Sequence, residues 1–185
     1  MKKNKEFETE RIKLVKPNLK YLEEFFIYAS KPNIGPMAGW MPHKNITESK
    51  FILEEMMKND YTWIITTKDD KFIGTIDLRP TEWYQLFRPQ AYELGYSIDD
   101  TYWGQGITVE AANLLLDYAF NELKIKEIEV SHADHNHQSR RVIEKLGFRF
   151  LKSEYQEKYR NYALSMSLYK MTKHDYDRRD KIWVH

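Results

Sequence analysis

The feature that most constrains the fold is a strand that ends in a glycine-containing loop and continues directly into a long helix. Tyr92–Ile98 is predicted to be the strand, and Gly104 and Gly106 stand two residues apart in the loop that follows it. From Gly106 to Leu123 the apolar residues recur at the spacing of one helix face, and they are Val109, Ala112, Leu116, Ala119 and Leu123. The first amides of a helix lack partners within it and lie at the positive end of its dipole, while glycines let a phosphate approach the backbone. The segment therefore predicts an anion site, although Gly-x-Gly before a helix is weak evidence by itself.

The rest of the pattern predicts a mixed sheet covered by helices. Strands are expected at Arg11–Lys16, Tyr61–Thr67, Phe72–Arg79, Tyr92–Ile98, Lys126–Ala133, Phe148–Tyr155 and Tyr162–Tyr169. Helices are expected at Leu19–Ser30, from Thr47 onward with Phe51, Ile52 and Met56 buried, at Gly106–Leu123 and at Asn136–Leu146, the last closed by Gly147. Prolines and glycines make Lys31–Lys44 a predicted loop. The order β-α-α-β-β-β-α-β-α-β-β indicates the α/β (α+β) class. One domain is expected over residues 1–185, with a core at about 7–170 and a polar tail at 171–185.

Composition excludes several classes of function. The 29 Lys and Arg residues nearly balance the 28 Asp and Glu residues, which argues against nucleic acid as the main partner. The absence of cysteine removes disulfides, thiolate metal sites and a cysteine nucleophile. Met1–Glu10 lacks the apolar stretch of a signal peptide, and no run is long enough to span a membrane. Asn45-Ile46-Thr47 matches a glycosylation acceptor, but without a secretion signal Thr47 is better explained as a helix N-cap. We therefore expect a soluble cytoplasmic protein.

A second motif follows about thirty residues after the glycine loop. It begins at Asn136 and runs to Phe148. Asn136 is expected to cap the following helix by accepting a hydrogen bond from the amide of Ser139. The apolar residues of this helix, Val142, Ile143 and Leu146, are expected in the core.

Taken together, the two motifs resemble those of the GNAT superfamily of acetyl-CoA-dependent N-acetyltransferases. The resemblance is greatest to the subgroup of bacterial ribosomal-protein N-terminal acetyltransferases, and it covers about Arg11 to Tyr169. That family carries Gln/Arg-x-x-Gly-x-Gly/Ala at the start of the helix after its fourth strand. Thr101 departs from the Gln or Arg at the first position, whereas Gly104 and Gly106 match. The other matching residues are Trp103, Glu110-Ala111, Asn136, Ser139 and Glu144–Phe148.

The resemblance implies a mostly antiparallel GNAT-like sheet flanked by helices, and acetyl-CoA as the cosubstrate. The pyrophosphate of CoA would bind the backbone amides of the glycine loop, formed by Trp103, Gly104, Gln105, Gly106, Ile107 and Thr108. Backbone groups of Tyr96, Ser97 and Ile98 would bind the pantetheine arm where strands four and five separate. Asn136 would bind the pantetheine side while keeping its capping role. Arg140 or Arg141 could reach the adenosine phosphates, although arginines at helix ends are more often only solvated.

The resemblance also assigns candidate catalytic groups. Ser139 matches the serine that the subgroup uses to protonate the leaving sulfur, and the tyrosine that other relatives use is absent at Ile143-Glu144. Glu93 on the fourth strand is the candidate base, with Glu82 and Asp134 as alternatives. The close spacing of His132, His135 and His137 is also typical of a zinc site, but we expect no metal here. A histidine in this segment could instead relay protons. Without cysteine or a nucleophile elbow, direct attack by the amine in a ternary complex is expected.

The acceptor remains open at this level. The closest subgroup acts on a protein N-terminal α-amine. A small amine (polyamine, amino acid or antibiotic) is the alternative acceptor, and a non-catalytic CoA-binding module is the alternative from another class. The acceptor site is expected to involve the Lys31–Lys44 loop, the Trp83–Gln90 loop and the final hairpin, with an aromatic mouth of Trp40, Trp83, Tyr84 and Phe87. No nucleic acid or membrane partner is expected, and a homodimer is left open.

Overall fold

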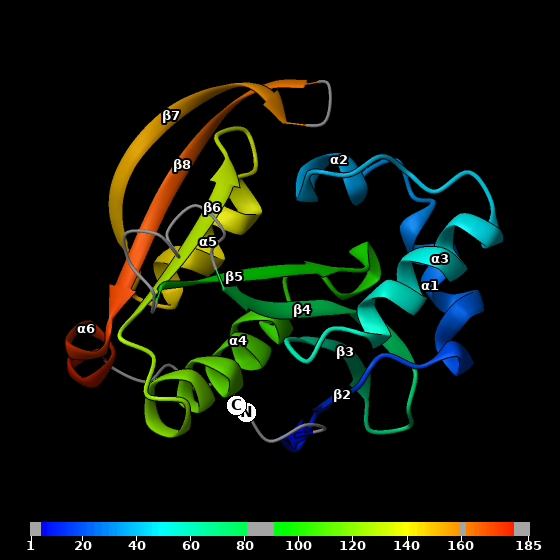
Figure 1. The fold of residues 1–185 in the computed structure, drawn as a ribbon, viewed down its shortest axis with the longest axis horizontal. Coiled ribbons are helices and arrows are strands. Elements are labelled where there is room, and N and C mark those ends of the chain that lie inside the picture. The colour runs from blue at the N-terminus through cyan, green and yellow to red at the C-terminus, as the bar shows by residue number, and fades with distance from the viewer. Residues whose placement is uncertain (1–4, 81–90, 160–161, 180–185) are drawn as a thin grey trace. The chain divides into compact units, whose positions relative to one another are not determined.

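The computed structural model describes residues 5–80, 91–159 and 162–179 (Figure 1). The chain divides into two compact units. The first holds the residues up to Asp77 together with Tyr96–Ala111, and the second holds Leu78–Gly95 together with the residues from Ala112 onward. The division passes through two strands and one helix, so each unit is described by itself. The single domain expected over residues 1–185 stays a prediction.

Antiparallel strands form the sheet of the first unit. They are, in spatial order, β1 (Phe7–Glu8), β2 (Ile12–Val15), β3 (Thr62–Thr67) and β4 (Phe72–Pro80). Ile12 lies opposite Thr67, and Thr62 lies opposite Asp77. The end of β5 (Ala91–Ile98) lies beside β4, where the Asp99 amide donates to the Ile73 carbonyl at 2.8 Å. The strands predicted at Arg11–Lys16, Tyr61–Thr67 and Phe72–Arg79 are confirmed, whereas the two-residue β1 was not predicted.

The helices of the first unit pack around a shared apolar cluster. They are the 3-10 turn Leu19–Tyr21, α1 (Leu22–Ala29), α2 (Gly35–Ala38) and α3 (Ile46–Met57). The buried members of the cluster include Phe25, Tyr28, Leu53, Ile64 and Phe72. Leu53 is fully buried, so α3 contributes its core face through this position.

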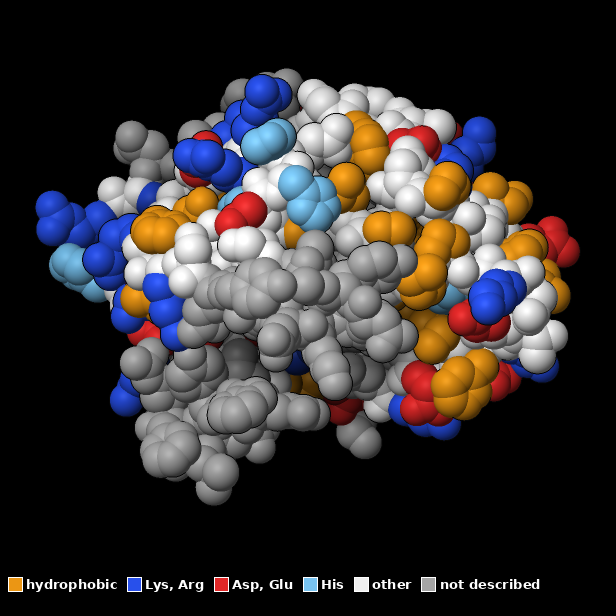
Figure 2. Space-filling view, turned by 90° about the horizontal axis from the view of Figure 1, so that it is seen from above, with side chains coloured by type: hydrophobic (Ala, Val, Ile, Leu, Met, Phe, Trp, Pro, Cys, Tyr) orange, Lys and Arg blue, Asp and Glu red, His pale blue; other side chains and the backbone are white. Residues whose placement is uncertain are grey.

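Two predictions about α3 are wrong. Its N-cap is Asn45, whose side chain accepts a hydrogen bond from the Glu48 amide at 2.9 Å; Thr47 already lies in the first turn. Phe51 is 60% exposed and Ile52 is 37% exposed. The buried face follows Ser49 and Leu53, four residues apart, and this leaves Phe51 and Ile52 on other sides of the helix. Figure 2 shows hydrophobic side chains at the surface over the part that holds α2 and α3.

The predicted loop Lys31–Lys44 also needs a correction, because it contains the one-turn helix α2. A proline at the start of this helix is compatible with helical geometry, since the first amides need no partner within the helix. Gly39 follows the helix in a left-handed conformation and ends it.

The second unit continues the sheet from β5. The strands follow in the order β5, β6 (Glu127–Ala133), β8 (Tyr162–Thr172) and β7 (Arg149–Tyr159). β5 and β6 run parallel, whereas β6–β8 and β7–β8 are antiparallel. This mixed, mostly antiparallel sheet with helices confirms the predicted fold class.

Of the three helical segments that lie wholly or partly in the second unit, two differ in detail from the predictions. The predicted helix Gly106–Leu123 is α4 (Ile107–Asp117) followed by a π-helical turn, Tyr118–Glu122. α5 (His137–Lys145) is confirmed. The tail forms α6 (Lys173–Arg178), which is fixed to the end of α4 because the Tyr176 hydroxyl donates to Asp117 at 2.7 Å. Among the described residues, no helix is both long and apolar enough to cross a membrane.

Candidate functional site

The glycine loop joins β5 to α4 in the first unit. A 3-10 turn (Asp100–Tyr102) follows the strand, and α4 begins at Ile107. Gly104 has φ 75° and Gly106 has φ 76°, a left-handed conformation that residues with a Cβ rarely adopt. A Cβ at Gly104 would meet no described atom within 4 Å, so the protein leaves the space beside this glycine open. The loop therefore has the backbone form expected of an anion site at a helix N-terminus.

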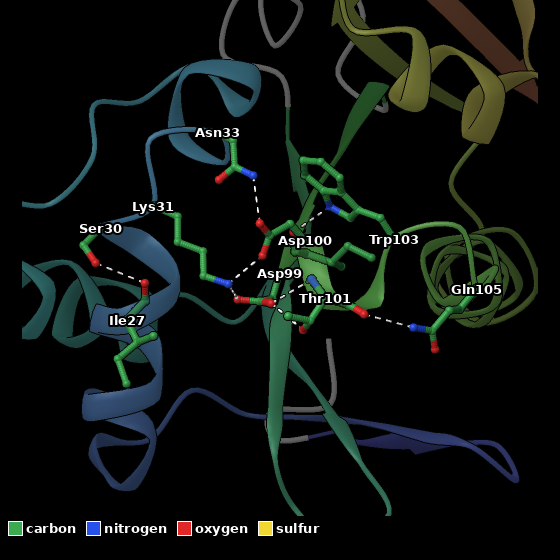
Figure 3. Close-up of polar contacts among 10 residues, drawn as sticks. Ile27, Ser30, Lys31, Asn33, Asp99, Asp100, Thr101, Trp103 and Gln105 are labelled. Carbon is green, nitrogen blue, oxygen red and sulfur yellow. Dashed lines mark hydrogen bonds and ion pairs between the residues drawn. The ribbon is translucent and has the colours of Figure 1, made fainter.

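Thr101, the residue that departs from the family pattern, stabilises the turn before the loop. Its amide and its hydroxyl both donate to Oδ1 of Asp99, at 3.0 Å and 2.6 Å. Its carbonyl accepts from the Gln105 side-chain amide at 3.0 Å (Figure 3). Thr101 therefore links the end of β5 to the glycine loop through these hydrogen bonds.

Trp103 anchors the loop to the interior. Its indole N–H donates to the Ile98 carbonyl at 3.1 Å, and its ring packs against the apolar cluster. The carbonyl of Ile98 is therefore engaged by this indole. The predicted binding of the pantetheine arm by backbone groups of Tyr96, Ser97 and Ile98 stays a prediction.

Lys31, a cation that contacts the turn before the glycine loop, was not predicted from the sequence. Lys31 Nζ lies 2.7 Å from Oδ2 of Asp99 and 2.6 Å from Oδ1 of Asp100. Asn33 adds a side-chain hydrogen bond to Asp100 at 2.8 Å (Figure 3). These bonds, from Lys31 first and Asn33 second, lower the pKa of Asp100 to about 2. The available signal was the pair of adjacent aspartates before a predicted anion site, which requires a compensating cation.

Glu110 fixes the start of α4 to the N-terminal strands. This carboxylate is buried, and it accepts a hydrogen bond from Arg11 Nε at 2.8 Å as well as one from the Thr9 hydroxyl. Arg11 Nη1 also donates to the Gln105 carbonyl at 3.2 Å. The acid of the acid–alanine pair is therefore an anchor that holds the back of the glycine loop.

The second motif lies in the second unit, at the start of α5. Asn136 is the N-cap, and its side-chain oxygen accepts from the Ser139 amide at 3.0 Å, as predicted. Ser139 is half-buried in the first turn. Arg140 forms an ion pair with Glu144 at 2.8 Å on the exposed side of the helix, and Arg141 is also exposed.

The alternative base Asp134 is poorly suited to that role. Its carboxylate accepts hydrogen bonds from the hydroxyls of Ser165 at 2.5 Å and Ser167 at 2.7 Å. These bonds, with Ser165 the larger cause, hold the pKa of Asp134 below its ordinary value. A carboxylate stabilised in this way is a weaker proton acceptor.

Glu93 lies on β5 where the pairing with β6 ends. The described register matches Ala91–Glu93 with Glu127–Glu129, while β5 continues to Ile98 and β6 to Ala133. The Glu93 side chain is 39% exposed and lies 3.8 Å from Nη2 of Arg79. Its predicted role as a base stays a prediction.

The histidine cluster does not act as a unit. His132 is buried, with Nδ1 2.8 Å from the Ala133 carbonyl and Nε2 3.4 Å from the Tyr169 hydroxyl, whereas His135 and His137 are exposed. Within the described part of the chain, no three His, Cys, Asp or Glu side chains form a group that could hold a metal.

The predicted aromatic mouth is described only in part. Trp40 is half-buried against the apolar cluster, and its ring centroid lies 5.9 Å from that of Tyr28, so it covers core residues. The other members of the mouth, Trp83, Tyr84 and Phe87, lie outside the described residues, and so does Glu82, the other alternative base.

Comparison with known proteins defines the class. The acetyltransferase (GNAT) domain family matches residues 11–149, and the chain belongs to this family. It is 40% identical over 107 residues to the probable N-acetyltransferase YjcK of Bacillus subtilis (strain 168). That match covers 57% of this chain and 56% of the relative, so the aligned region spans little more than half of the relative's length.

Solved structures share the fold at low sequence identity. A GNAT-family acetyltransferase from Bacillus anthracis matches with a TM-score of 0.81 and 20% identity, covering 92% of this chain and 99% of that one. The microcin C7 self-immunity acetyltransferase MccE, solved with acetyl-CoA and AMP, matches with a TM-score of 0.74 and 20% identity over 89% and 93% of the two chains. The ribosomal-protein-S5-alanine acetyltransferase from Vibrio fischeri matches with a TM-score of 0.71 and 22% identity over 94% and 99%.

Proposed function

We propose that this protein is an N-acetyltransferase that transfers the acetyl group of acetyl-CoA to a primary amine. The observation that carries the proposal is the loop between β5 and α4, in which Gly104 and Gly106 are both left-handed, in a chain of the GNAT family. This family uses acetyl-CoA as its cosubstrate. The cytoplasmic location stays a prediction from the sequence.

The proposed CoA site uses backbone groups more than side chains. The amides from Trp103 to Thr108 bind the pyrophosphate, because helix N-termini favour anions. Backbone groups of Tyr96–Ile98 bind the pantetheine arm. Asn136 binds the same arm. It also keeps its capping bond, in which the Asn136 side-chain oxygen accepts from the Ser139 amide at 3.0 Å.

The proposed chemistry is direct. Glu93, itself or through a water, takes a proton from the acceptor ammonium, and the free amine nitrogen attacks the thioester carbonyl. The C–N bond forms and the C–S bond breaks. Ser139 gives its hydroxyl proton to the departing sulfur, and the nitrogen of the new amide loses its second proton, which restores the Ser139 hydroxyl directly or through solvent. Glu93 is preferred to Asp134 because the two serine hydroxyls lower the pKa of Asp134 and so make it a weaker proton acceptor.

For the acceptor we propose a protein N-terminal α-amine. The support is the resemblance of Trp103, Glu110-Ala111 and the Asn136–Phe148 block to the ribosomal-protein subgroup, together with the fold shared with the S5-alanine enzyme. Small amines are the second candidate acceptor.

The test is an acceptor panel with release of free CoA thiol as the readout. The protein contains no cysteine, so a thiol reagent reports CoA without a protein background. The panel pairs peptides that have a free α-amine with the same peptides acetylated at the N-terminus, and adds polyamines, amino acids and aminoglycosides. We expect thiol release with the free peptides and none with the blocked ones. Thiol release with small amines alone would overturn the proposed acceptor. Binding of CoA without thiol release in the presence of any amine would favour a non-catalytic binding module.

A further inference from the structure

Two carboxylates stand immediately before the loop that is proposed to bind the CoA pyrophosphate. Asp99 and Asp100 directly follow β5, and the loop glycines begin at Gly104. Asp99 is buried and Asp100 is half-buried. Uncompensated negative charge at this position repels an anionic cosubstrate, and the repulsion is stronger where protein shields the charges from water.

Lys31 contacts both carboxylates at once and offsets one of their two negative charges. Its ammonium lies 2.7 Å from Asp99 and 2.6 Å from Asp100, and its side chain is only 25% exposed. Burial alone would lower the pKa of Lys31, but its hydrogen bonds to Asp100 and Asp99 outweigh this effect and raise it. Figure 3 shows the Lys31 side chain directed at the two carboxylates from the chain segment that follows α1.

The geometry also links Lys31 to the conformation of the loop. Asp99 uses its other oxygen, Oδ1, to hold the amide and hydroxyl of Thr101, and Trp103 donates to the carbonyl of Ile98. Lys31 binds Oδ2 of the same carboxylate. A cation that orients Asp99 therefore orients the turn leading into the glycine loop.

We propose that Lys31 is a positioning residue of the CoA site. It offsets one of the two negative charges of Asp99 and Asp100 and holds the turn between β5 and the glycine loop, so that the loop amides meet the pyrophosphate in a preorganised form and beside less negative charge. Its ammonium is engaged by carboxylates, and it acts on CoA through the loop. The inference rests on the proposed function, since it presumes that the loop binds CoA.

The experiment compares affinities for CoA and for pantetheine, which lacks the phosphates, by calorimetry. Lys31→Met removes the charge, and Lys31→Arg keeps it. Lys20→Met is the matched control, because Lys20 forms an ion pair of similar length with Asp70 at 2.5 Å, also in the first unit. We expect Lys31→Met to weaken CoA binding by about tenfold at low salt and by less at about 1 M salt, where charges are screened. Lys31→Arg recovers most of the affinity, and Lys20→Met leaves it unchanged.

Two further measurements separate charge from folding. Asp100→Asn removes one negative charge and leaves Lys31 its bond to Asp99, so this variant is expected to bind CoA at least as tightly as the wild type. It keeps the proposal testable if Lys31→Met does not fold. Pantetheine affinity should change less than about twofold in Lys31→Met, because a neutral ligand does not sense the lost charge.

Each outcome is decisive for one of the two proposals. Equal loss of CoA and pantetheine affinity, or unchanged CoA affinity in a folded Lys31→Met, overturns the role of Lys31. Weaker CoA binding by Asp100→Asn also overturns it. If the wild type binds no CoA at all, the proposed function fails first.

Discussion

At the scale of single residues, Ser139 combines a structural role of its backbone amide with a proposed chemical role of its hydroxyl. The amide of Ser139 belongs to the N-cap of α5 through its bond to Asn136. Its half-buried side chain is the proposed acid. The amide bond is common to any N-capped helix, whereas donation of a proton to sulfur exists only while the C–S bond breaks.

Ser139→Ala is therefore expected to lower kcat by about 10²–10⁴-fold with little change in CoA affinity. The capping bond uses the backbone amide, which alanine retains, so the melting temperature should change little. Saturation kinetics, a CoA titration and a thermal melt on this variant check the prediction. If kcat and affinity both stay within about threefold of the wild type, Ser139 is structural and another group protonates the sulfur.

The pKa of Asp100 gives a prediction about stability. Its folded pKa of about 2 lies below the ordinary value of 3.8, chiefly because of the hydrogen bond from Lys31. A depressed folded pKa contributes stability that is complete above the unfolded pKa and is lost as the pH falls through the folded one. The difference in unfolding free energy between the wild type and Asp100→Asn should be constant from about pH 7 to 5 and shrink between about pH 4 and 2. Urea unfolding across this range measures it, and a difference that already shrinks between pH 7 and 5 contradicts the assignment.

Residue roles were predictable where they depend on local sequence. The capping bond of Asn136 follows from its place before an apolar-faced helix, and the structure confirms it. The contact of Lys31 with Asp99 joins residues 68 positions apart; the adjacent aspartates indicate that a cation is needed, but no local pattern indicates that it is Lys31. Phe51 and Ile52 were assigned to the core because of their apolar character, but burial depends on which face of α3 meets the cluster, and that is decided by tertiary packing.

At the scale of elements, the close approach of β4 and β5 depends on Gly74. A Cβ at this position would overlap the Ser97 carbonyl oxygen and lie 2.6 Å from the Ile98 Cα, both backbone atoms. β5 ends at Ile98, directly before the turn that leads to the glycine loop. The spacing of these strands therefore helps to set where the loop begins.

Gly74→Ala should destabilise the protein by about 1–3 kcal/mol or more, because backbone must move to accommodate the methyl group. The control is Gly147→Ala, where the nearest atom to the added Cβ is the Arg179 Cβ at 3.5 Å and the cost is about 1–2 kcal/mol for the left-handed backbone. Denaturant unfolding compares the two variants. A Gly74→Ala protein as stable as the wild type would contradict the close packing of these strands.

The helices and strands were largely predictable, because periodicity and turn residues report on local conformation. The elements that were missed are short or lie in polar segments. β1 has two residues, α2 has four, and α6 lies in the polar tail. Their formation depends on partners elsewhere in the chain, as in the bond of Tyr176 in α6 to Asp117.

At the scale of the whole molecule, the proposed reaction needs no covalent intermediate on the protein. The chain has no cysteine, and the groups assigned to the reaction are an acid and a base. Incubation with acetyl-CoA alone should therefore leave the intact mass of the protein unchanged. An acetylated residue that passes its acetyl group to an added amine at a competent rate would replace the direct route with a two-step one.

The most direct test of the account is a calorimetric titration of acetyl-CoA into the wild type and into Gly106→Val. Gly106 is left-handed, with φ 76°, directly before α4, and a β-branched side chain there strains the backbone and would fill the space that we propose for the pyrophosphate. Circular dichroism and a thermal melt establish that the variant is folded. The account predicts one acetyl-CoA site in the wild type and its loss in folded Gly106→Val. A wild type that binds no acetyl-CoA, or a folded Gly106→Val that binds it with unchanged affinity, would contradict it.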